Sequence, residues 1–433
     1  MSTSIRYLRL SLHLPTGGQR VIGYMSSYGD IIRVSFDQTY IDDQGRPTLS
    51  LAYVGETEAA TKRILSAKRD VRLVQSNGRL PVYFQNLLPE GHNRARLAQQ
   101  RNCTEDDEFE LLAAAGHDLM GAIEAEPVPP QEGIPDAIRL WHTTQGLEVL
   151  EAGFVESPIQ DAFSLPGVVT KFSAVHDGRR YVVKRHGEAG AYILKLPSTR
   201  HPTLVANEYA GYQLCKALGL SCAEAQIISR EDAELPEQAQ FDTLLAVKRF
   251  DRAAGHIRIH MEEFAQVLQY PPGKKYGVDM MLDYSRALRV LDQLSVNRVQ
   301  DTAEFIRRLT AFILMGNTDA HLKNWALLYP DGIHPVLAPI YDPVCVAALL
   351  DEVPESDYKV NRTIDEKLRT FSWEQMEDLM TRAGIVRVAR HMQIARDTVA
   401  QAKARWPAVM GTAPVTVRSA VTARLDGGVA LAR

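Results

Sequence analysis

The chain has few cysteines and no long apolar run, and these two absences limit the classes of protein to which it can belong. Its four cysteines, Cys103, Cys215, Cys222 and Cys345, show no CxxC spacing. The sequence therefore favours four reduced, mostly buried thiols in a reducing compartment over a disulfide framework. No apolar stretch reaches the roughly 18 residues that a membrane span needs. This excludes a membrane-spanning class and predicts a cytoplasmic protein with no signal peptide, no anchor and no membrane partner.

An excess of one charge is also lacking. Lys and Arg total 49 and Asp and Glu total 53, so the net charge is −4. This excludes a globally basic nucleic-acid binder, although it leaves room for a local basic patch or a DNA-binding partner. A hydrophobic content of 45% and a charged content of 24% are ordinary for a soluble globular protein.

The order of the expected elements favours an α+β fold. Residues 5–55 are typical of short strands, whereas the pattern from Met280 onward is mostly helical. The proline-rich segment 126–130 predicts a linker, and the tail from Gly411 is expected to be loosely ordered. A length of 433 residues suggests two or three domains, so we expect a two-lobed body with strands first and helices afterwards.

The strongest chemical signal is the polar loop Gly316 to Asn324, which lies between an apolar helix and an apolar strand. Such a loop holds its side chains on a rigid support. Asp319 and Asn324 are five residues apart, as in the D-x-x-x-x-N catalytic loop of phosphotransferases. There the aspartate accepts the proton of the attacking hydroxyl, and the asparagine supplies a neutral oxygen to Mg²⁺.

A second carboxylate follows at the end of the next strand. Asp342 lies eighteen residues after Asn324, and Mg²⁺ prefers carboxylate oxygens together with phosphates. Taken alone, the Asp-x-x-x-x-Asn spacing favours a capped turn with Asp319 at a helix end. Together with Asp342, it favours a site for magnesium and a triphosphate.

Two further residues of this loop have open roles. His321 is a candidate base or metal ligand, but a histidine that orients the loop by hydrogen bonding is the favoured interpretation. Lys323 is interpreted as a charge near the transferred phosphate, with a solvated lysine as the alternative.

Lys195 lies within the apolar strand 192–196, where an unpaired charge would cost free energy. Kinases place such a lysine against the α- and β-phosphates, and Glu208 at the start of the next helix is an available partner. A lysine on an edge strand that faces water is an equal alternative. Glu208 by itself is typical of a residue in the first turn of a helix.

Two weaker segments complete the nucleotide hypothesis. Residues 164–171 are a candidate phosphate-covering loop, in which backbone N–H groups hold phosphate and Lys171 adds charge. Read alone, this segment is better explained as a plain turn. Residues 247–252 end a strand and are a candidate adenine connector, with a solvated strand end as the simpler interpretation.

Taken in order, these segments resemble the HipA family of bacterial serine/threonine kinases, the toxins of HipBA toxin–antitoxin modules. Eight motifs between residues 88 and 342 carry the resemblance. They are Leu88-Pro89-Glu90-Gly91, Ser164-x-x-Gly167-Val168-x-x-Lys171, Ile193-x-Lys195-Leu196-Pro197, Asn207-Glu208-Tyr209, Val247-x-Arg249-Phe250-Asp251-Arg252, Lys275-Tyr276, Gly316-x-x-Asp319-x-His321-x-Lys323-Asn324 and Pro339-x-Tyr341-Asp342.

The resemblance implies a two-lobed, protein-kinase-like fold behind an N-terminal β-rich subdomain, with ATP and Mg²⁺ as cofactors. It implies that Asp319 is the catalytic residue, that Asn324 and Asp342 hold the metal, and that Ser164 is autophosphorylated. The implied nucleotide-binding residues are Pro166, Gly167, Val168, Val169, Thr170, Lys171, Lys195, Lys248, Arg249, Phe250, His321, Lys323, Asn324, Tyr341 and Asp342. The implied domains are the N-terminal subdomain at 1–130 and the kinase core at 131–433. The core would hold a nucleotide-binding part at about 150–255, a helical catalytic lobe at about 256–410 and the tail at 411–433.

The resemblance also implies partners. These are a HipB-like helix-turn-helix antitoxin, DNA contacted mainly through the antitoxin complex, and a protein substrate such as an aminoacyl-tRNA synthetase. Phosphorylation of Ser164 would eject the phosphate loop and stop ATP binding. The sequence departs from the family at Val169-Thr170, where many members have Gln followed by Pro or Glu, and Pro166 would stiffen the loop. The alternatives are a small-molecule kinase and an inactive kinase-fold corepressor that acts with a DNA-binding antitoxin.

Overall fold

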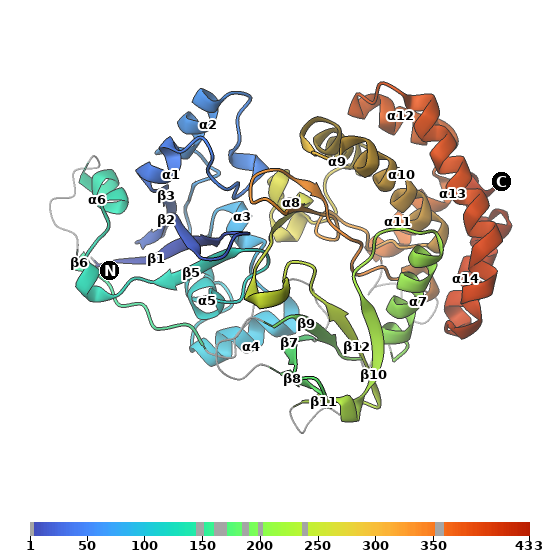
Figure 1. Cartoon of the computed structure of the whole chain (residues 1–433), viewed down its shortest axis with the longest axis horizontal. Helices are drawn as coiled ribbons and strands as arrows, with labels where there is room; N and C mark the ends of the chain where they lie inside the picture. Colours follow the sequence, from blue (N-terminus) through green and yellow to red (C-terminus); the bar gives the residue numbers. More distant parts are fainter. Residues whose placement is uncertain are drawn as a thin grey trace. The chain divides into compact units, whose positions relative to one another are not determined.

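The computed structural model describes residues 4–143, 151–159, 171–183, 190–197, 202–235, 241–350 and 359–433. The chain divides into two compact units (Figure 1). Unit 1 comprises Met1–Tyr192, Phe250–Gly273 and Leu328–His334. Unit 2 comprises Ile193–Arg249, Lys274–Leu327 and Pro335–Arg433. The domain limits expected from the sequence, 1–130 and 131–433, remain a prediction.

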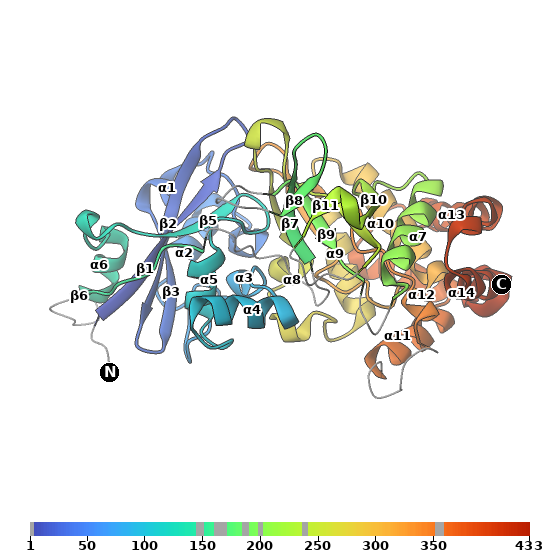
Figure 2. The same cartoon turned by 90° about the horizontal axis from the view of Figure 1, so that it is seen from below.

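Unit 1 begins with a mostly antiparallel sheet whose strands run in the order β4-β3-β2-β1-β5, with β6 also paired to β1 (Figure 2). The strands are β1 (Ser4–His13), β2 (Gln19–Tyr28), β3 (Ile31–Phe36), β4 (Val74–Gln75), β5 (Ile123–Pro127) and β6 (Glu151–Ala152). Leu8, Leu10 and Leu12 alternate along β1 and are buried, as the period of a strand requires. The strands expected over residues 5–55 are confirmed as far as Phe36, but the expectation is wrong beyond it, where α1 (Gln38–Asp42) and a 3-10 turn (Leu51–Tyr53) lie.

The expected linker at 126–130 is wrong at its start. Glu126 and Pro127 belong to β5 and pair with Arg9 and Leu8 of β1. Proline is tolerated there because it ends the strand. The sheet partner of this segment lies more than a hundred residues away in sequence, so the local composition gave no sign of it.

The rest of unit 1 consists of helices and short strands. They are α1 (Gln38–Asp42), α2 (Glu58–Leu65), α3 (Val82–Gln85), α4 (Gly91–Arg101), α5 (Glu108–Ala115), α6 (Asp136–Thr143), β7 (Lys171–His176), β8 (Tyr181–Val183), β13 (His260–Glu263) and α8 (Phe264–Val267). Helix α5 begins after Asp107, whose side chain accepts a hydrogen bond from the backbone N–H of Glu110. Such a side chain is the usual N-cap of an α-helix.

Unit 2 carries a small sheet in which β9, β12 and β10 are neighbours, followed by a layer of helices. The strands are β9 (Tyr192–Lys195), β10 (Ala225–Ser229), β11 (Ala233–Glu234), β12 (Thr243–Lys248), β14 (Ala326–Tyr329) and β15 (Val336–Leu337). The unit boundaries fall within β9, after Tyr192, and within β14, after Leu327. The helices are α7 (Leu204–Ala217), α9 (Met280–Leu294), α10 (Arg298–Met315), α11 (Lys359–Thr370), α12 (Trp373–Ala383), α13 (Val388–Val409) and α14 (Val415–Ala423).

Helix α10 is the centre of the helical layer, and it packs against α9 and α13 (Figure 1). Its last turns, from Leu309 to Met315, are entirely buried. Helix α13 is fixed to α7 because the Trp406 indole Nε1 donates a hydrogen bond of 2.9 Å to the backbone oxygen of Leu214. The helices expected after Met280 are therefore confirmed, and they surround the end of α10 that leads into the polar loop.

The tail after Gly411 is ordered, which corrects the expectation of a loose tail. It forms α14, and Val417 and Val421 of this helix are buried. Beyond α14, Arg424 donates hydrogen bonds to the backbone oxygen of Ile313 at 2.8 Å and to Asp365 at 2.6 Å. The tail thus packs on the C-terminal end of α10, a long-range contact that local sequence did not indicate.

A buried carboxylate lies in unit 1, on β13. Glu262 accepts hydrogen bonds from the hydroxyl of Ser50 at 2.6 Å, from the backbone N–H of Leu51 at 2.9 Å, and from the hydroxyl of Tyr329. Burial raises the pKa of Glu262 to about 7, although the three donors act in the opposite direction. This side chain therefore changes its charge near neutral pH.

The raised pKa of Glu262 predicts a pH dependence of stability. The folded state binds the proton more tightly than the unfolded state, whose carboxyl pKa is near 4.5. The resulting stabilisation is complete below that value and is lost, up to about 3 kcal/mol, as the pH rises through about 7. Glu262→Gln should remove this loss, so the difference in melting temperature between variant and wild type should grow in favour of the variant from pH 5 to pH 8. Parallel curves would contradict the assignment, and Glu56→Gln, at an exposed position, controls for the substitution itself.

Candidate functional site

The polar loop begins where α10 ends. Gly316 closes the helix in a left-handed conformation with φ of 74°, and a Cβ atom at this position would lie 2.5 Å from the Cβ of Ala347. Both the backbone conformation and the close contact require glycine. The loop therefore leaves the buried helix at a fixed point and a fixed angle.

Asp319 lies on this loop with its side chain partly exposed, at 39%. Its backbone N–H donates to Oδ1 of Asn317 at 3.2 Å, and its carboxylate Oδ1 accepts a hydrogen bond of 2.5 Å from the hydroxyl of Tyr276. No donor to Oδ2 is found among the described residues. Since Gly316 is the C-cap of α10, the alternative of Asp319 as a helix-end residue is wrong.

Asn324 closes the loop onto Asp319. Its amide Nδ2 donates a hydrogen bond of 2.7 Å to the backbone oxygen of Asp319. The amide oxygen is thereby turned away from that contact, and within the described ranges it has no hydrogen-bond donor. The five-residue spacing thus has a structural cause, because it lets the asparagine bond back to the aspartate while keeping one oxygen for a ligand.

Lys195 is buried between two carboxylates. Its Nζ donates a hydrogen bond of 2.7 Å to Glu208 and also bonds to Asp342. Burial alone would lower the pKa of Lys195, but Asp342 and Glu208 outweigh burial and raise it. Only 5% of Lys195 is exposed, so the alternative of a lysine that faces water is wrong.

Asp342 has an unusual backbone. Its φ is 53°, in the left-handed region that residues other than glycine rarely adopt. Its backbone N–H donates a hydrogen bond of 3.3 Å to the hydroxyl oxygen of Tyr212 on α7. Such conformations cost on the order of 1 kcal/mol or more and persist only where the surroundings fix them. The ion pair with Lys195 and the contact with Tyr212 help to fix the backbone of Asp342 in this conformation.

Helix α7 approaches the segment after Asp342 very closely. Asn207 exchanges two hydrogen bonds with the backbone of Cys345, at 3.0 and 2.8 Å. A Cβ atom on Gly211 would lie 1.7 Å from the backbone oxygen of Pro343, so only glycine fits. This contact places Glu208 beside Lys195. Asn207, Gly211 and Tyr212 support the site, and sequence reasoning gave them no role.

The loop that carries Asn324 and the segment that carries Asp342 are also joined directly. The hydroxyl of Tyr341 donates a hydrogen bond of 2.7 Å to the backbone oxygen of Lys323. These residues directly precede Asp342 and Asn324, so the bond links the segments that carry the two expected metal ligands. Lys323 itself is buried, with 3% exposed, which excludes the solvated alternative. His321 is buried and its ring meets the ring of Tyr276 edge-on, with centroids 5.2 Å apart.

Of the other residues predicted to bind nucleotide, the structure describes Lys171, Lys248, Arg249 and Phe250. Lys248 is exposed and pairs with Glu224 at 3.2 Å, whereas Arg249 is buried. Lys171 and Phe250 belong to unit 1, and Lys171 is buried there. Ser164, Pro166, Gly167, Val168, Val169 and Thr170 lie outside the described residues. The nucleotide-binding and autophosphorylation roles of these residues remain predictions.

The residues present fit a metal–nucleotide ligand better than a metal alone. Within the described residues, no group of three or more His, Cys, Asp or Glu side chains could hold a metal ion. Asn324 and Asp342 supply hard oxygen atoms, and Mg²⁺ commonly completes its shell with water and phosphate oxygens.

Among the residues that the structure describes, no helix combines the length and hydropathy needed to cross a bilayer.

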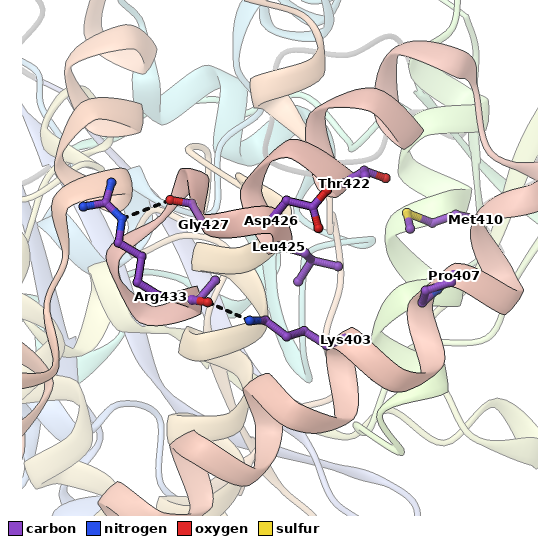
Figure 3. Close-up of a pocket in the computed structure, with 9 residues that line it drawn as sticks. Lys403, Pro407, Met410, Thr422, Leu425, Asp426, Gly427 and Arg433 are labelled. Atoms are coloured by element: carbon purple, nitrogen blue, oxygen red, sulfur yellow. Dashed lines mark hydrogen bonds between the residues drawn. The ribbon is translucent and has the colours of Figure 1, made fainter.

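A separate pocket of about 440 Å³ lies in unit 2 between α13 and the segment after α14 (Figure 3). Its lining residues are Lys403, Pro407, Met410, Thr422, Leu425, Asp426, Gly427, Ala432 and Arg433. Two of its polar side chains are engaged, since Lys403 donates to the backbone oxygen of Ala432 at 2.6 Å and Arg433 donates to that of Gly427 at 3.0 Å. The pocket shares no residue with the Lys195–Asp342 site.

Comparison with known proteins identifies the family. A model of the HipA-like C-terminal domain matches residues 163–406, more than half of the chain, and a model of the HipA N-terminal domain matches residues 16–126. The chain belongs to the HipA family. The eight motifs that resembled this family in the sequence are thereby accounted for.

Relatives of the chain are named as kinases. "Putative kinase Y4dM" of Sinorhizobium fredii is 32% identical over 399 residues, which cover 90% of this chain and 89% of that protein. The serine/threonine-protein kinase toxin HipA of Shewanella oneidensis is 26% identical over 300 residues, which cover 63% of this chain and 64% of the toxin. By family, the chain is a HipA-type kinase.

A solved structure shows the same fold. HipA in the complex of Shewanella oneidensis MR-1 HipA, HipB and operator DNA matches with a TM-score of 0.65 at 20% identity. The match covers 98% of this chain and 96% of that one. The expected α+β, protein-kinase-like fold of HipA type is confirmed.

The buried ion pairs of Lys195 predict a large cost for its removal. Lys195→Met would leave the Glu208 and Asp342 carboxylates facing each other without a cation, which should destabilise the protein by about 3 kcal/mol. Lys248→Met is the matched control, because the exposed pair with Glu224 should contribute less than about 1 kcal/mol. Urea unfolding at pH 7 measures both values, and equal effects of the two substitutions would contradict this account of the site.

Proposed function

We propose that this protein is an ATP- and Mg²⁺-dependent serine/threonine protein kinase and the toxin of a HipBA-type toxin–antitoxin module. One observation carries the proposal. The loop with Asp319 and Asn324 is joined to the segment with Asp342 through the bond between Tyr341 and Lys323, and Asp342 is in turn paired with Lys195. A proton acceptor, two oxygen ligands and a buried cation therefore belong to one connected set, which is the set that phosphoryl transfer needs.

Each residue of this set has a distinct role in the proposal. Asp319 orients the attacking hydroxyl and accepts its proton at the carboxylate. The oxygens of Asn324 and Asp342 would hold Mg²⁺, and Lys195 would contact the nucleotide phosphates. When bound, ATP would supply the phosphoryl group and Mg²⁺ would neutralise the charge on the phosphate oxygens. Most of the rate would then come from positioning and charge stabilisation by fixed groups.

Glu208 would keep Lys195 charged and oriented when Asp342 binds the metal. When Asp342 serves the metal, Lys195 still has a buried carboxylate 2.7 Å away. The lysine thus stays charged and oriented, which is the role of the lysine–glutamate pair in protein kinases.

The finer parts of the proposal come from the family. The nucleotide site would include residues 166–171, Lys248 to Phe250, His321, Lys323 and Tyr341, and Ser164 would be the autophosphorylation site. A HipB-type antitoxin would bind the chain and bring it to DNA, as the composition of the Shewanella complex supports. The substrate would be a protein of translation such as an aminoacyl-tRNA synthetase, and its phosphorylation would arrest growth in the cytoplasm.

The direct test is phosphate transfer by wild type and by Asp319→Asn. With Mg·[γ-³²P]ATP and a bacterial protein extract, wild type should label protein on serine or threonine. The variant should lose about 10²- to 10⁴-fold in rate while it retains Mg·ATP binding by calorimetry, because only the proton acceptor is removed. Asp397→Asn, at an exposed position on α13, is the matched control.

The same experiment separates the alternatives. Equal rates of Asp319→Asn and wild type would overturn the assignment of the catalytic residue. Label found on a small alcohol and none on protein would favour a small-molecule kinase. Calorimetry that shows no Mg·ATP binding to wild type would favour an inactive corepressor.

A further inference from the structure

The Lys275-Tyr276 motif is not used by the mechanism above, although it contacts the loop that carries Asp319. Tyr276 lies 43 residues before Asp319, and its hydroxyl donates a hydrogen bond of 2.5 Å to carboxylate Oδ1. Of the described residues, it is the only one whose side chain donates a hydrogen bond to this carboxylate. Nε2 of His321 is 3.7 Å from Oδ1, too far for a hydrogen bond.

Tyr276 is held in a rigid turn. The backbone N–H of Gly277 donates to the oxygen of Lys274 at 2.8 Å, and Gly277 has a left-handed φ of 72°. Asp283, buried at the start of α9, accepts hydrogen bonds from the backbone N–H groups of Val278 at 2.9 Å and Asp279 at 3.1 Å. The turn is therefore fixed to the start of α9.

The same turn is also bonded to the loop. The backbone N–H of Leu322 donates to the oxygen of Lys275 at 3.0 Å, and the ring of His321 packs edge-on against the ring of Tyr276. Main chain and side chains thus set the distance between the tyrosine and the loop. The phenol hydroxyl is aimed at Asp319 from a position that two elements determine.

The hydrogen bond has a chemical consequence for the carboxylate. A partly exposed aspartate can rotate about its side-chain bonds, and each rotation moves the oxygen that must meet the attacking hydroxyl. A phenol that donates to Oδ1 fixes this rotation and leaves Oδ2 to accept the proton. Small errors in such placement cost large factors in rate.

We propose that Tyr276 is a positioning residue that holds the Asp319 carboxylate through Oδ1, so that Oδ2 faces the hydroxyl of the substrate. The inference rests on the proposed function, because it gives Asp319 the role of proton acceptor. It also gives His321 a role, which is to support the ring of Tyr276 rather than to act as a base.

The test compares Tyr276→Phe with Tyr284→Phe. Tyr284 is a matched control, because its hydroxyl donates to the backbone oxygen of Ala320 in the same loop but does not contact the carboxylate. We would measure the rate of ³²P transfer at saturating Mg·[γ-³²P]ATP, into the acceptor that wild type labels, and the dissociation constant of Mg·ATP by calorimetry. Tyr276→Phe should slow transfer roughly 10- to 100-fold, as expected for the loss of a hydrogen bond to a charged group, with nucleotide affinity within about twofold of wild type.

The outcomes are distinct. Tyr284→Phe should lower the melting temperature yet slow transfer less than Tyr276→Phe does. An active wild type with an unchanged rate in Tyr276→Phe would overturn the inference alone. Equal slowing by both substitutions, or a parallel loss of nucleotide affinity in Tyr276→Phe, would show a merely structural role and would also overturn it. A wild type without transfer or Mg·ATP binding would overturn the proposed function together with the inference.

Discussion

The site depends on one buried cation shared by two carboxylates. Lys195 comes from a strand, Glu208 from α7, and Asp342 from the segment after β15, so a single ammonium group connects three parts of unit 2. A buried charge is tolerated only where partners compensate its loss of hydration. Lys195 is therefore paired with carboxylates from two separate segments of the chain.

Small residues make this connection possible. Gly211 lets α7 approach the backbone of Pro343, and Gly316 lets α10 end against Ala347. Neither position has room for a Cβ atom, because Gly211 lies against the backbone of Pro343 and Gly316 lies against the side chains of Ala347 and Arg424. The strained backbone of Asp342 directly precedes Pro343, and the contacts of the segment that follows explain how it persists. Precision at the site is therefore a property of its supporting elements as much as of its polar residues.

The sequence predicted the parts of the site that depend on local spacing. The pair Asp319 and Asn324, the apolar strand around Lys195 and the helix before Gly316 follow from patterns of a few residues. The sequence could not predict the bond between Tyr276 and Asp319, the pairing of β5 with β1 or the ordered tail. Each of these depends on a partner far away in sequence, and composition alone does not identify such a partner. The left-handed backbone of Asp342 was equally hidden, because aspartate gives no local sign of it.

The contact between Arg424 and Ile313 has a consequence for how relatives are compared. The guanidinium group satisfies a carbonyl oxygen in the last turn of α10, at the negative end of the helix dipole, one turn before the loop with Asp319. A homologue with every motif from Leu88 to Asp342 but a shortened or diverged end would lack this support. A homologue can therefore keep every motif and still lose the support of the loop. A survey of this family that scores motifs alone would not detect that loss.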